Sequence, residues 1–315
     1  MRRRPSRLVT ATAAVIVAVP VLAACEAKVY GTTPQPTGPQ LTVIAPMGTK
    51  APLPESPPDV PAAAFAGLDA RARRATAEAA KAGADITTTV LDRNTGQIVS
   101  NGNNEAMPIA SVVKLFIADD LLLQEAKGQT QLSPADRQAL DAMLRSSDDS
   151  AAETFWNRSG GSAIISRVTA RYGLSATTTP YNGRWFNTLS TTTDLVRYYD
   201  KLLSGSAGLP PERANIILSN LAASTPTAID GTQPGGTYPQ RFGIPEGLYA
   251  ERVAVKQGWM CCWNGGNWMH MSTGVIGTDR RFVMAIASMQ PADGITARNT
   301  ITQAVKTMFP SGRIA

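Results

Sequence analysis

Ser111 and Lys114 are two residues whose types and spacing could do chemistry. They lie three apart in the stretch MPIASVVKLFIADDLL, residues 107–122, whose apolar residues recur at helical spacing. Residues three apart share a helix face, so the lysine amine can approach the serine hydroxyl. A lysine held neutral by burial or by nearby positive charge can accept the serine proton while the oxygen attacks an acyl carbon. The pair is suited to acyl transfer, although a serine that only starts a core helix fits the same pattern.

A second polar group lies in SSDDSAAETFW, residues 146–156, ahead of another run with helical periodicity. Ser147 and Asp149 are the candidates for chemistry in this segment. The same residue types are favoured at the start of a helix, and Ser150 with Glu153 matches a capping box. Helix capping alone therefore accounts for the segment.

A third group is Lys256-Gln257-Gly258 in AVKQGWM, which the sequence predicts to be a strand. Taken in order, the three segments resemble the motifs of the penicillin-recognising serine enzymes, which comprise class A β-lactamases and DD-peptidases. Those motifs are SxxK, then S-D-N, then K-T-G on a late strand. The resemblance covers about residues 62–315, and the whole chain also resembles the actinobacterial alanine-rich lipoproteins of the LppW type.

The resemblance implies a β-lactamase/transpeptidase-like fold of the mixed α/β (α+β) class, with an antiparallel five-stranded sheet flanked by helices and an all-helical subdomain. It also implies roles, position by position. Ser111 is expected to be the acylated nucleophile and Lys114 its proton partner. Ser147 would relay a proton to the leaving nitrogen, and Lys256 would supply positive potential. The backbone N–H groups of Ser111 and Trp259 would form the oxyanion hole.

The motifs depart from the family pattern at Asp149 and Gln257. Asp149 stands in place of the Asn of S-D-N. It can pair with Lys114, but its carboxylate donates no hydrogen bond unless it is protonated. Gln257 replaces the hydroxyl residue of K-T-G, so an amide beside Gly258 would have to recognise a substrate carboxylate.

No acidic residue lies between Glu153 and Asp194, the interval in which a class A β-lactamase keeps the glutamate that activates water. An acyl-enzyme at Ser111 would therefore persist, because a positioned base contributes about 10²- to 10⁴-fold. We expect a serine acyl-transfer protein that acts on or recognises peptidoglycan-like peptides or β-lactams, and not an efficient class A β-lactamase. The alternative is a catalytically degraded lipoprotein that binds a cell-envelope ligand or partner. Trp185, in the same interval, fits either core packing or a pocket wall.

The adjacent Cys261 and Cys262 allow two interpretations, a pair of partly buried thiols or a disulfide between neighbours, which would need a kinked peptide. A turn centred near Gly265 would place His270 opposite Met260, in a structural or a proton-transfer role. Since His270 is the single histidine of the chain, an ordinary histidine-built metal site is excluded, and no cofactor is expected.

The first 24 residues have the pattern of a secretory signal, with four arginines before a short apolar run. The run ends in Leu-Ala-Ala-Cys, which resembles a bacterial lipobox and implies a diacylglyceryl group on Cys25. We expect a protein exported and anchored by this lipid to the outer face of the cell membrane. Without the signal the chain has 26 basic and 24 acidic residues and no basic stripe, which argues against a nucleic-acid partner.

The elements that must position these residues lie in one domain, residues 62–315. Residues 25–61 hold nine prolines and are expected to be a tether with a reach of up to about 100 Å. The sequence then predicts a helix to Gly83, two strands around an Asn-Thr-Gly turn, and a helical part over about 110–221. Three strands and a closing helix complete an α/β part formed by residues 62–109 and about 222–315.

Overall fold

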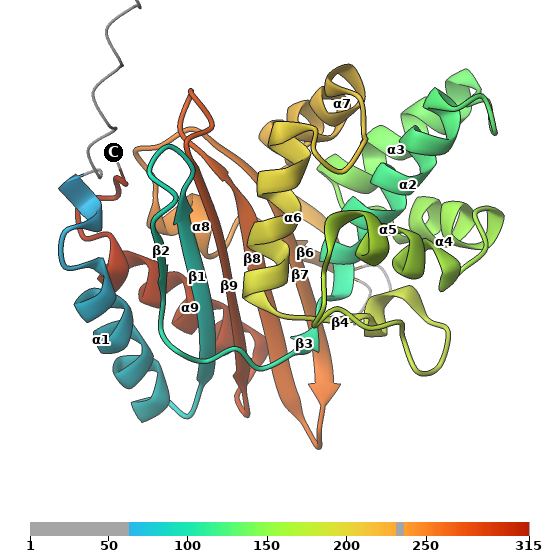
Figure 1. Ribbon diagram of the computed structural model, residues 1–315. Helices are drawn as coiled ribbons and strands as arrows, with labels where there is room; N and C mark the ends of the chain where they lie inside the picture. Colours follow the sequence, from blue (N-terminus) through green and yellow to red (C-terminus); the bar gives the residue numbers. More distant parts are fainter. Residues whose placement is uncertain (1–62, 231–235, 315) are drawn as a thin grey trace, which may run out of the picture. The chain divides into compact units, whose positions relative to one another are not determined.

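The computed structural model describes residues 63–230 and 236–314 (Figure 1). The signal segment, Cys25 and most of the tether lie outside the described residues. The elements in chain order are a 3-10 turn η1 (Ala63–Phe65), α1 (Leu68–Lys81), β1 (Asp85–Asp92), β2 (Ile98–Ser100), β3 (Met107–Pro108), a second 3-10 turn η2 (Ala110–Val113), α2 (Lys114–Ala126), α3 (Pro134–Arg145), α4 (Asp149–Arg158), α5 (Ala163–Tyr172), η3 (Trp185–Asn187), β4 (Leu189–Ser190), α6 (Thr192–Ser204), α7 (Pro211–Ala222), β5 (Thr227–Asp230), β6 (Gly236–Pro239), α8 (Ile244–Gly247), β7 (Val253–Trp263), β8 (Asn267–Ile276), β9 (Phe282–Gln290) and α9 (Gly294–Met308).

The central sheet has five antiparallel strands in the order β2-β1-β9-β8-β7. Strands from both ends of the domain meet at the pairing of β1 with β9, and the helical part is inserted between them, as the order of elements predicts. The predicted mixed α/β fold with a five-stranded antiparallel sheet is confirmed. β7 is one of the two edge strands, so one side of its backbone lies outside the sheet.

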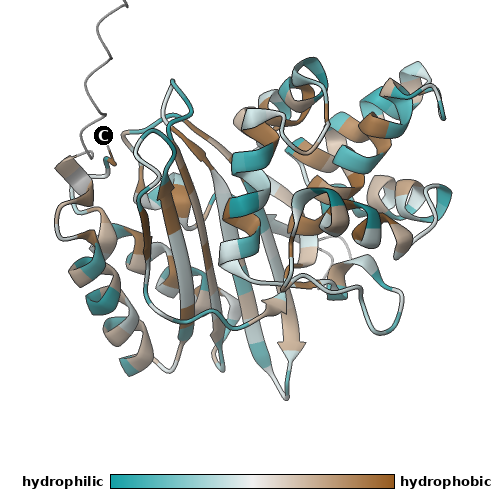
Figure 2. Ribbon diagram, in the orientation of Figure 1, coloured by the Kyte–Doolittle hydropathy of each residue, from teal (hydrophilic) through white to brown (hydrophobic). Residues whose placement is uncertain are grey.

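Helices cover both faces of the sheet (Figure 1). α1, α8 and α9 lie on one face, and α6 with the rest of the helical part lies on the other. β9 supplies both cores by strict alternation, because Met284 and Ile286 pack toward α1 and α9 while Val283 and Ala285 pack toward the helical part. Figure 2 shows the apolar colour concentrated on the strands and on the inner sides of the helices.

The N-terminal helix and the strands β5 and β6 differ from the sequence-based expectation. The predicted N-terminal helix is divided at Gly67, whose backbone φ of 68° suits glycine and ends the η1 turn before α1 begins. The short strands β5 and β6 were not predicted, because four residues each, with a proline in β6, carry too little periodicity to identify. Among the described residues, no helix has the length and apolar character that a membrane span requires.

Candidate active site

Ser111 lies in the η2 turn just before α2, and not inside a regular helix. Ala110 has a positive φ of 42°, which bends the chain so that η2 starts the helical run against β7. Ser111 is nearly buried, while the apolar residues that follow Lys114 pack into the core of the helical part. A reactive serine and a serine that starts a core helix are therefore compatible interpretations of the SVVK segment, because the turn that begins the helix also places the Ser111 hydroxyl at a cavity.

The Lys114 side chain connects the first two motifs. Its Nζ lies 2.9 Å from Ser111 Oγ and 3.1 Å from Ser147 Oγ, and it donates to the Ser147 carbonyl at 2.6 Å. It also donates to Asp149 Oδ1 at 2.5 Å, and the indole ring of Trp185 lies 4.8 Å away. Lys114 is fully buried, so each of these contacts replaces hydration that the amine has lost.

Ser147 contacts the two lysines, while its neighbour Asp148 caps α4. Asp148 is the N-cap of α4 and accepts a hydrogen bond from the Ala151 N–H at 2.7 Å. The expected capping box of Ser150 and Glu153 is wrong, because α4 starts two residues earlier than that motif requires. Ser147 precedes the cap with a φ of 59°, which leaves its hydroxyl free to meet the two lysines.

Lys256 approaches Ser147 from the sheet. Its Nζ lies 2.9 Å from Ser147 Oγ and donates to the Gln257 carbonyl at 3.0 Å. The Lys256 carbonyl accepts a hydrogen bond from Thr273 on β8, and Thr273 meets the Tyr199 hydroxyl of α6. Lys256 is thus fixed by its own strand, by the neighbouring strand and by a helix.

Burial dominates the electrostatics of both lysines. It lowers the pKa of Lys114, although the Asp149 carboxylate opposes this shift. Burial lowers the pKa of Lys256 well below the usual range, and the neighbouring Lys114 lowers it further. A neutral amine beside Ser111 is what a proton acceptor for that hydroxyl requires.

Gly258 brings β7 against the backbone of Ser111. A Cβ at Gly258 would lie 2.5 Å from the Ile109 carbonyl oxygen and 3.1 Å from the Ser111 amide nitrogen. Any larger residue would push the strand away, so only glycine permits this approach. Trp259 follows directly, and its backbone therefore lies close to that of Ser111, as an oxyanion hole made by the two amides would require.

Gln257 points away from Ser147, into the face of the sheet that α9 covers. Its side chain is buried, its Nε2 has no hydrogen-bond partner among the described residues, and it is not one of the residues that line the cavity. The strand alternation that directs Lys256 and Gly258 toward the helical part directs Gln257 to the opposite side. The Gln257 amide therefore does not lie on the surface of the cavity.

His270 pairs with Trp259 and not with Met260, so the expected pairing is wrong by one residue. The turn does centre on Gly265, since Trp263 pairs with Asn267, but the register shifts by one between Met260 and Trp263. His270 consequently faces the α9 side, where it is buried and contacts the Tyr238 hydroxyl at 2.6 Å. Burial lowers its pKa to about 3, and the Arg298 charge adds to this shift.

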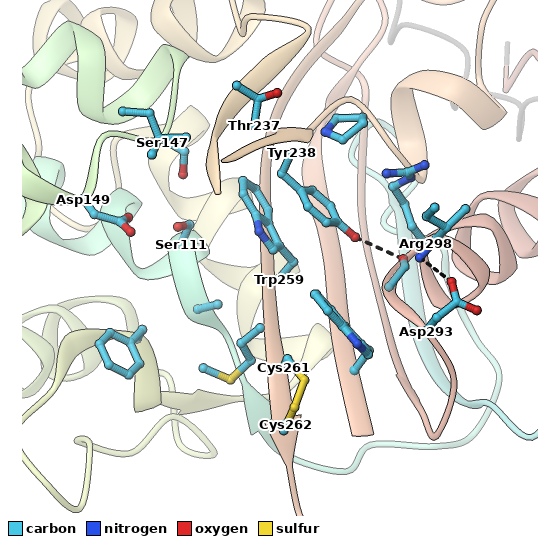
Figure 3. Close-up of a pocket in the computed structure, with 18 of the residues that line it drawn as sticks. Ser111, Ser147, Asp149, Thr237, Tyr238, Trp259, Cys261, Cys262, Asp293 and Arg298 are labelled. Atoms are coloured by element: carbon cyan, nitrogen blue, oxygen red, sulfur yellow. Dashed lines mark hydrogen bonds between the residues drawn. A yellow bond between two sulfur atoms is a disulfide. The ribbon is translucent and has the colours of Figure 1, made fainter. Parts of the chain in front are cut away.

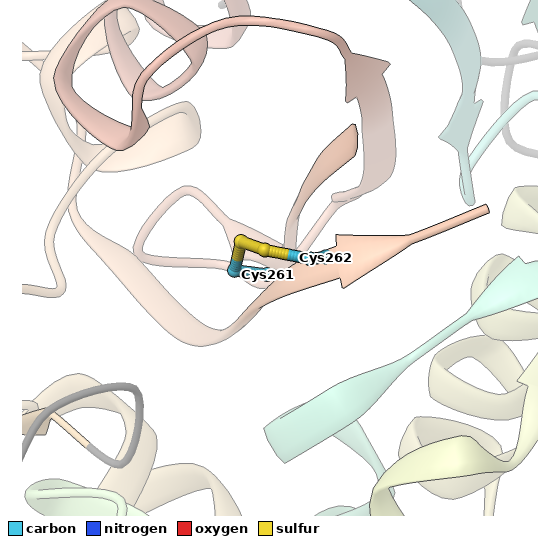
Figure 4. The surroundings of a disulfide bond; sticks show 2 residues. All are labelled: Cys261 and Cys262. Carbon is cyan, nitrogen blue, oxygen red and sulfur yellow. A yellow bond between two sulfur atoms is a disulfide. The ribbon is translucent and has the colours of Figure 1, made fainter. Parts of the chain in front are cut away.

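Cys261 and Cys262 lie at this register shift and are bonded to each other (Figure 4). The peptide bond between them is cis. Both residues line the cavity near the end of β7. Of the two alternatives that the sequence leaves open, the structure contains the disulfide between neighbours.

A cavity of about 990 Å³ extends from Ser111 across the edge of β7 (Figure 3). One half, which we call the serine lobe, is lined by Ser111, Ser147, Asp149, Trp185 and Phe186. Trp185 is both core and pocket wall, because its ring is almost buried and still lines this half. The other half, the aromatic lobe, is lined by Tyr238, Trp259, Trp268, Ile295 and Arg298. Sequence reasoning missed all of these except Trp259, since Tyr238 and Arg298 belong to no motif and reach the site only through the fold.

The carboxylates that line the described cavity are those of Asp149 and Asp293. The first pairs with Lys114, and the second caps α9 by accepting from the Ile295 and Thr296 N–H groups. Glu153 lies outside the lining residues and is held by the Trp185 indole N–H at 3.0 Å. Within the described residues, no cluster of three histidine, cysteine or acidic side chains could hold a metal ion.

Comparison with known proteins gives one close group of relatives. The chain is 55% identical over an alignment of 330 positions to the "Putative lipoprotein LppW" of Mycobacterium tuberculosis and of Mycobacterium bovis, and the alignment covers all of both chains. No protein-family profile matches the sequence.

Solved structures of class A β-lactamases and of the penicillin-binding protein PBP-A share the fold. PBP-A superposes with a TM-score of 0.63 at 16% identity, covering 81% of this chain and 98% of its own. A β-lactamase from Chitinophaga pinensis superposes with a TM-score of 0.60 at 14% identity, covering 78% of this chain and all of its own. At such low identity these similarities concern the fold.

Proposed function

The chain belongs to the LppW family of lipoproteins with a β-lactamase-like fold, and we propose that it is an exported, lipid-anchored protein whose Ser111 is acylated by peptidoglycan-like peptides or β-lactams. The lipid would be carried by Cys25 and would hold the domain at the outer face of the cell membrane. The observation that carries the proposal is the position of Lys114 Nζ, 2.9 Å from Ser111 Oγ and 3.1 Å from Ser147 Oγ.

The proposed reaction uses the side chains of Ser111, Lys114, Ser147 and Lys256. Lys114 takes the proton of Ser111 as Oγ attacks the carbonyl carbon of an amide or lactam, and the oxyanion is stabilised by backbone N–H groups. When the C–N bond breaks, Ser147 passes a proton to the leaving nitrogen and is resupplied by Lys114. Lys256, 2.9 Å from Ser147 Oγ, holds that hydroxyl in place.

Deacylation is expected to be slow, because neither carboxylate of the cavity is free to act on water. Asp149 is engaged by Lys114, and Asp293 is engaged by the start of α9. The acyl group on Ser111 would therefore last long after the leaving group departs.

The test is acylation by a fluorescent penicillin, followed by the intact mass of the domain and by gel fluorescence. We expect a stoichiometric adduct that lasts many minutes and that is absent from Ser111→Ala. Ser150→Ala is a matched control, since Ser150 is exposed at the start of α4. Absence of any adduct at high reagent excess would contradict acylation by β-lactams, and rapid consumption of the drug without an adduct would contradict slow deacylation.

A second function is supported by the same departures from the motifs. Asp149 holds Lys114 in an ion pair, and Gln257 does not line the cavity. These two features suit a protein that binds a cell-envelope ligand without turning it over. Binding of a peptidoglycan fragment that is unchanged in Ser111→Ala, together with no adduct in the penicillin test, would favour this function.

A further inference from the structure

The aromatic lobe lies on the α9 side of β7 and is separated from Ser111 by the Trp259 side chain (Figure 3). The ring of Tyr238 stacks on that of Trp259, with centroids 4.7 Å apart and planes 13° apart. The Trp268 ring lies nearly parallel to Tyr238 as well, at 6.2 Å. Three aromatic rings from β6, β7 and β8 thus form one layered wall.

This wall is held rigidly from behind. The Tyr238 hydroxyl meets His270 Nε2 at 2.6 Å and donates to the Gly294 carbonyl at 3.1 Å. A Cβ at Gly294 would lie 3.0 Å from the Trp268 ring, so α9 packs tightly against that side chain. Rigid, prepositioned rings lose little entropy when a ligand binds, which favours a binding role over a flexible surface.

Two apolar side chains at the rim of the cavity are exposed. Ile229 on β5 and Ile295 on α9 both line the cavity and are 64% and 63% exposed. Trp259 and Trp268 are only partly buried. Exposed apolar surface that gathers at one concave site marks a place where a ligand is bound.

Among the described residues, one cationic side chain, that of Arg298, lines the lobe. The Arg298 guanidinium lies over the Tyr238 ring, 5.4 Å from its centroid, and none of the described carboxylates lies within ion-pair distance of it. Asp293, the acidic residue of this lobe, has its oxygens engaged by the N-terminus of α9. Arginine binds carboxylates through two parallel hydrogen bonds, and these strengthen where water is displaced.

We propose that the aromatic lobe is a binding site for an amphiphilic carboxylate, a molecule with a flat apolar body and one carboxylate group. The apolar body lies against Trp259 and Trp268, and the carboxylate pairs with Arg298. One guanidinium matches one negative charge, whereas a phosphate dianion would leave charge uncompensated near Asp293. The site needs no reaction at Ser111, so it is independent of the proposed acyl transfer.

N-benzoylglycine and its neutral amide, N-benzoylglycinamide, are matched probes of this site. The exported domain is titrated with each, and the indole N–H signals of its five tryptophans are followed by NMR. Substitution of Trp259 and of Trp268 by Phe assigns their two signals. We expect N-benzoylglycine to shift these two signals and to leave those of Trp156 and Trp263 in place, and we expect the amide to bind at least tenfold more weakly, as for loss of a hydrogen bond to a charged group.

The variants separate this proposal from the acylation proposal. Arg298→Gln should lower the affinity for N-benzoylglycine about tenfold or more without changing the affinity for the amide. Arg298→Lys should recover part of the lost affinity. Arg252→Gln, an exposed arginine outside the cavity, and Ser111→Ala should both bind as the unmodified domain does. Equal affinity for acid and amide, no effect of Arg298→Gln, or the absence of any shift up to the solubility of the probe would each overturn the proposal.

Discussion

Lys114 and Asp149 form an ion pair whose two members lie in different surroundings. The lysine is fully buried, and the aspartate side chain is 51% exposed. The carboxylate stabilises the charged amine and so opposes the lowering of the Lys114 pKa by burial. Asp149 stands where the family motif has an asparagine. Its carboxylate therefore reduces the fraction of Lys114 that is neutral and can act as a base.

Asp149→Asn is expected to speed acylation of Ser111 near neutral pH. Loss of the carboxylate removes what favours the charged amine, so the pKa of Lys114 falls and more of it is neutral at a given pH. A partly exposed pair is worth at most about 1 kcal/mol, so we expect up to about fivefold in rate. The acylation rate measured against pH should rise with pH in both proteins and reach its midpoint at lower pH in the variant.

Asp148→Asn is the matched control for that variant. Asparagine retains the N-cap of α4, and Asp148 raises the pKa of Lys114 only through its charge, by less than Asp149 does. A pH midpoint that moves as far in this control as in Asp149→Asn would contradict the role given to the ion pair.

Lys256→Met should lower the acylation rate about 10²-fold without lowering the thermal unfolding temperature. Methionine retains the volume of the buried chain and needs no hydration, but it cannot hold the Ser147 hydroxyl. Lys127→Met, at an exposed position after α2, serves as the control. If the unfolding temperature and the rate fell together, the effect would be structural.

Gly258→Ala should abolish acylation, because the added Cβ would lie 2.5 Å from the Ile109 carbonyl and force β7 away from Ser111. Gly274→Ala is a useful comparison. Its Cβ would lie 2.4 Å from the Ala254 carbonyl, in the same strand pair but at a distance from the serine. Rates are compared per folded molecule. Loss of acylation in both variants would show that the strand pair, and not the local approach, is what matters.

His270→Gln should reduce the acid sensitivity of folding. The folded protein keeps His270 neutral down to a pH of about 3, its lowered pKa, whereas the unfolded chain protonates near 6.5. Between these values the unfolded state binds the extra proton, so stability falls as pH falls. The free energy of unfolding should drop between pH 7 and pH 5 by about 2 kcal/mol more in the unmodified protein than in the variant. Urea titrations at the two pH values measure this, and identical drops would contradict it.

Cys25→Ala is expected to release the full-length protein from the membrane fraction. Two acyl chains anchor stably because each buried methylene contributes about 0.8 kcal/mol, and the substitution removes their attachment point. Fractionation of cells that express each form, with detection by an antibody, is sufficient. Retention of the variant in the membrane would argue against the lipid.

The sheet was predictable from the sequence because β7, β8 and β9 are long, apolar and separated by clear turns. Lys114 could be singled out because a lysine is rare in apolar surroundings. Ser147 and Lys256 were assigned to the same site only because the three motifs follow one another in the order of the family pattern. The face of the sheet on which His270 lies could not be predicted. A register shift of one residue between Met260 and Trp263 exchanges the two faces, and no residue pattern near the turn indicates that shift. The aromatic lobe could not be predicted for a different reason. Tyr238 and Arg298 are far apart in the chain and come together only in the folded protein.

The cavity has residues of β7 between its two lobes, so the length of a ligand decides whether it can occupy one lobe or both. A ligand that reaches both Ser111 and Arg298 has to pass over Trp259, which lies between the two lobes (Figure 3). A short molecule can occupy one lobe at a time, so two short molecules can be bound together. A longer molecule can fill both, and it then gains the affinity of two sites while losing translational freedom once.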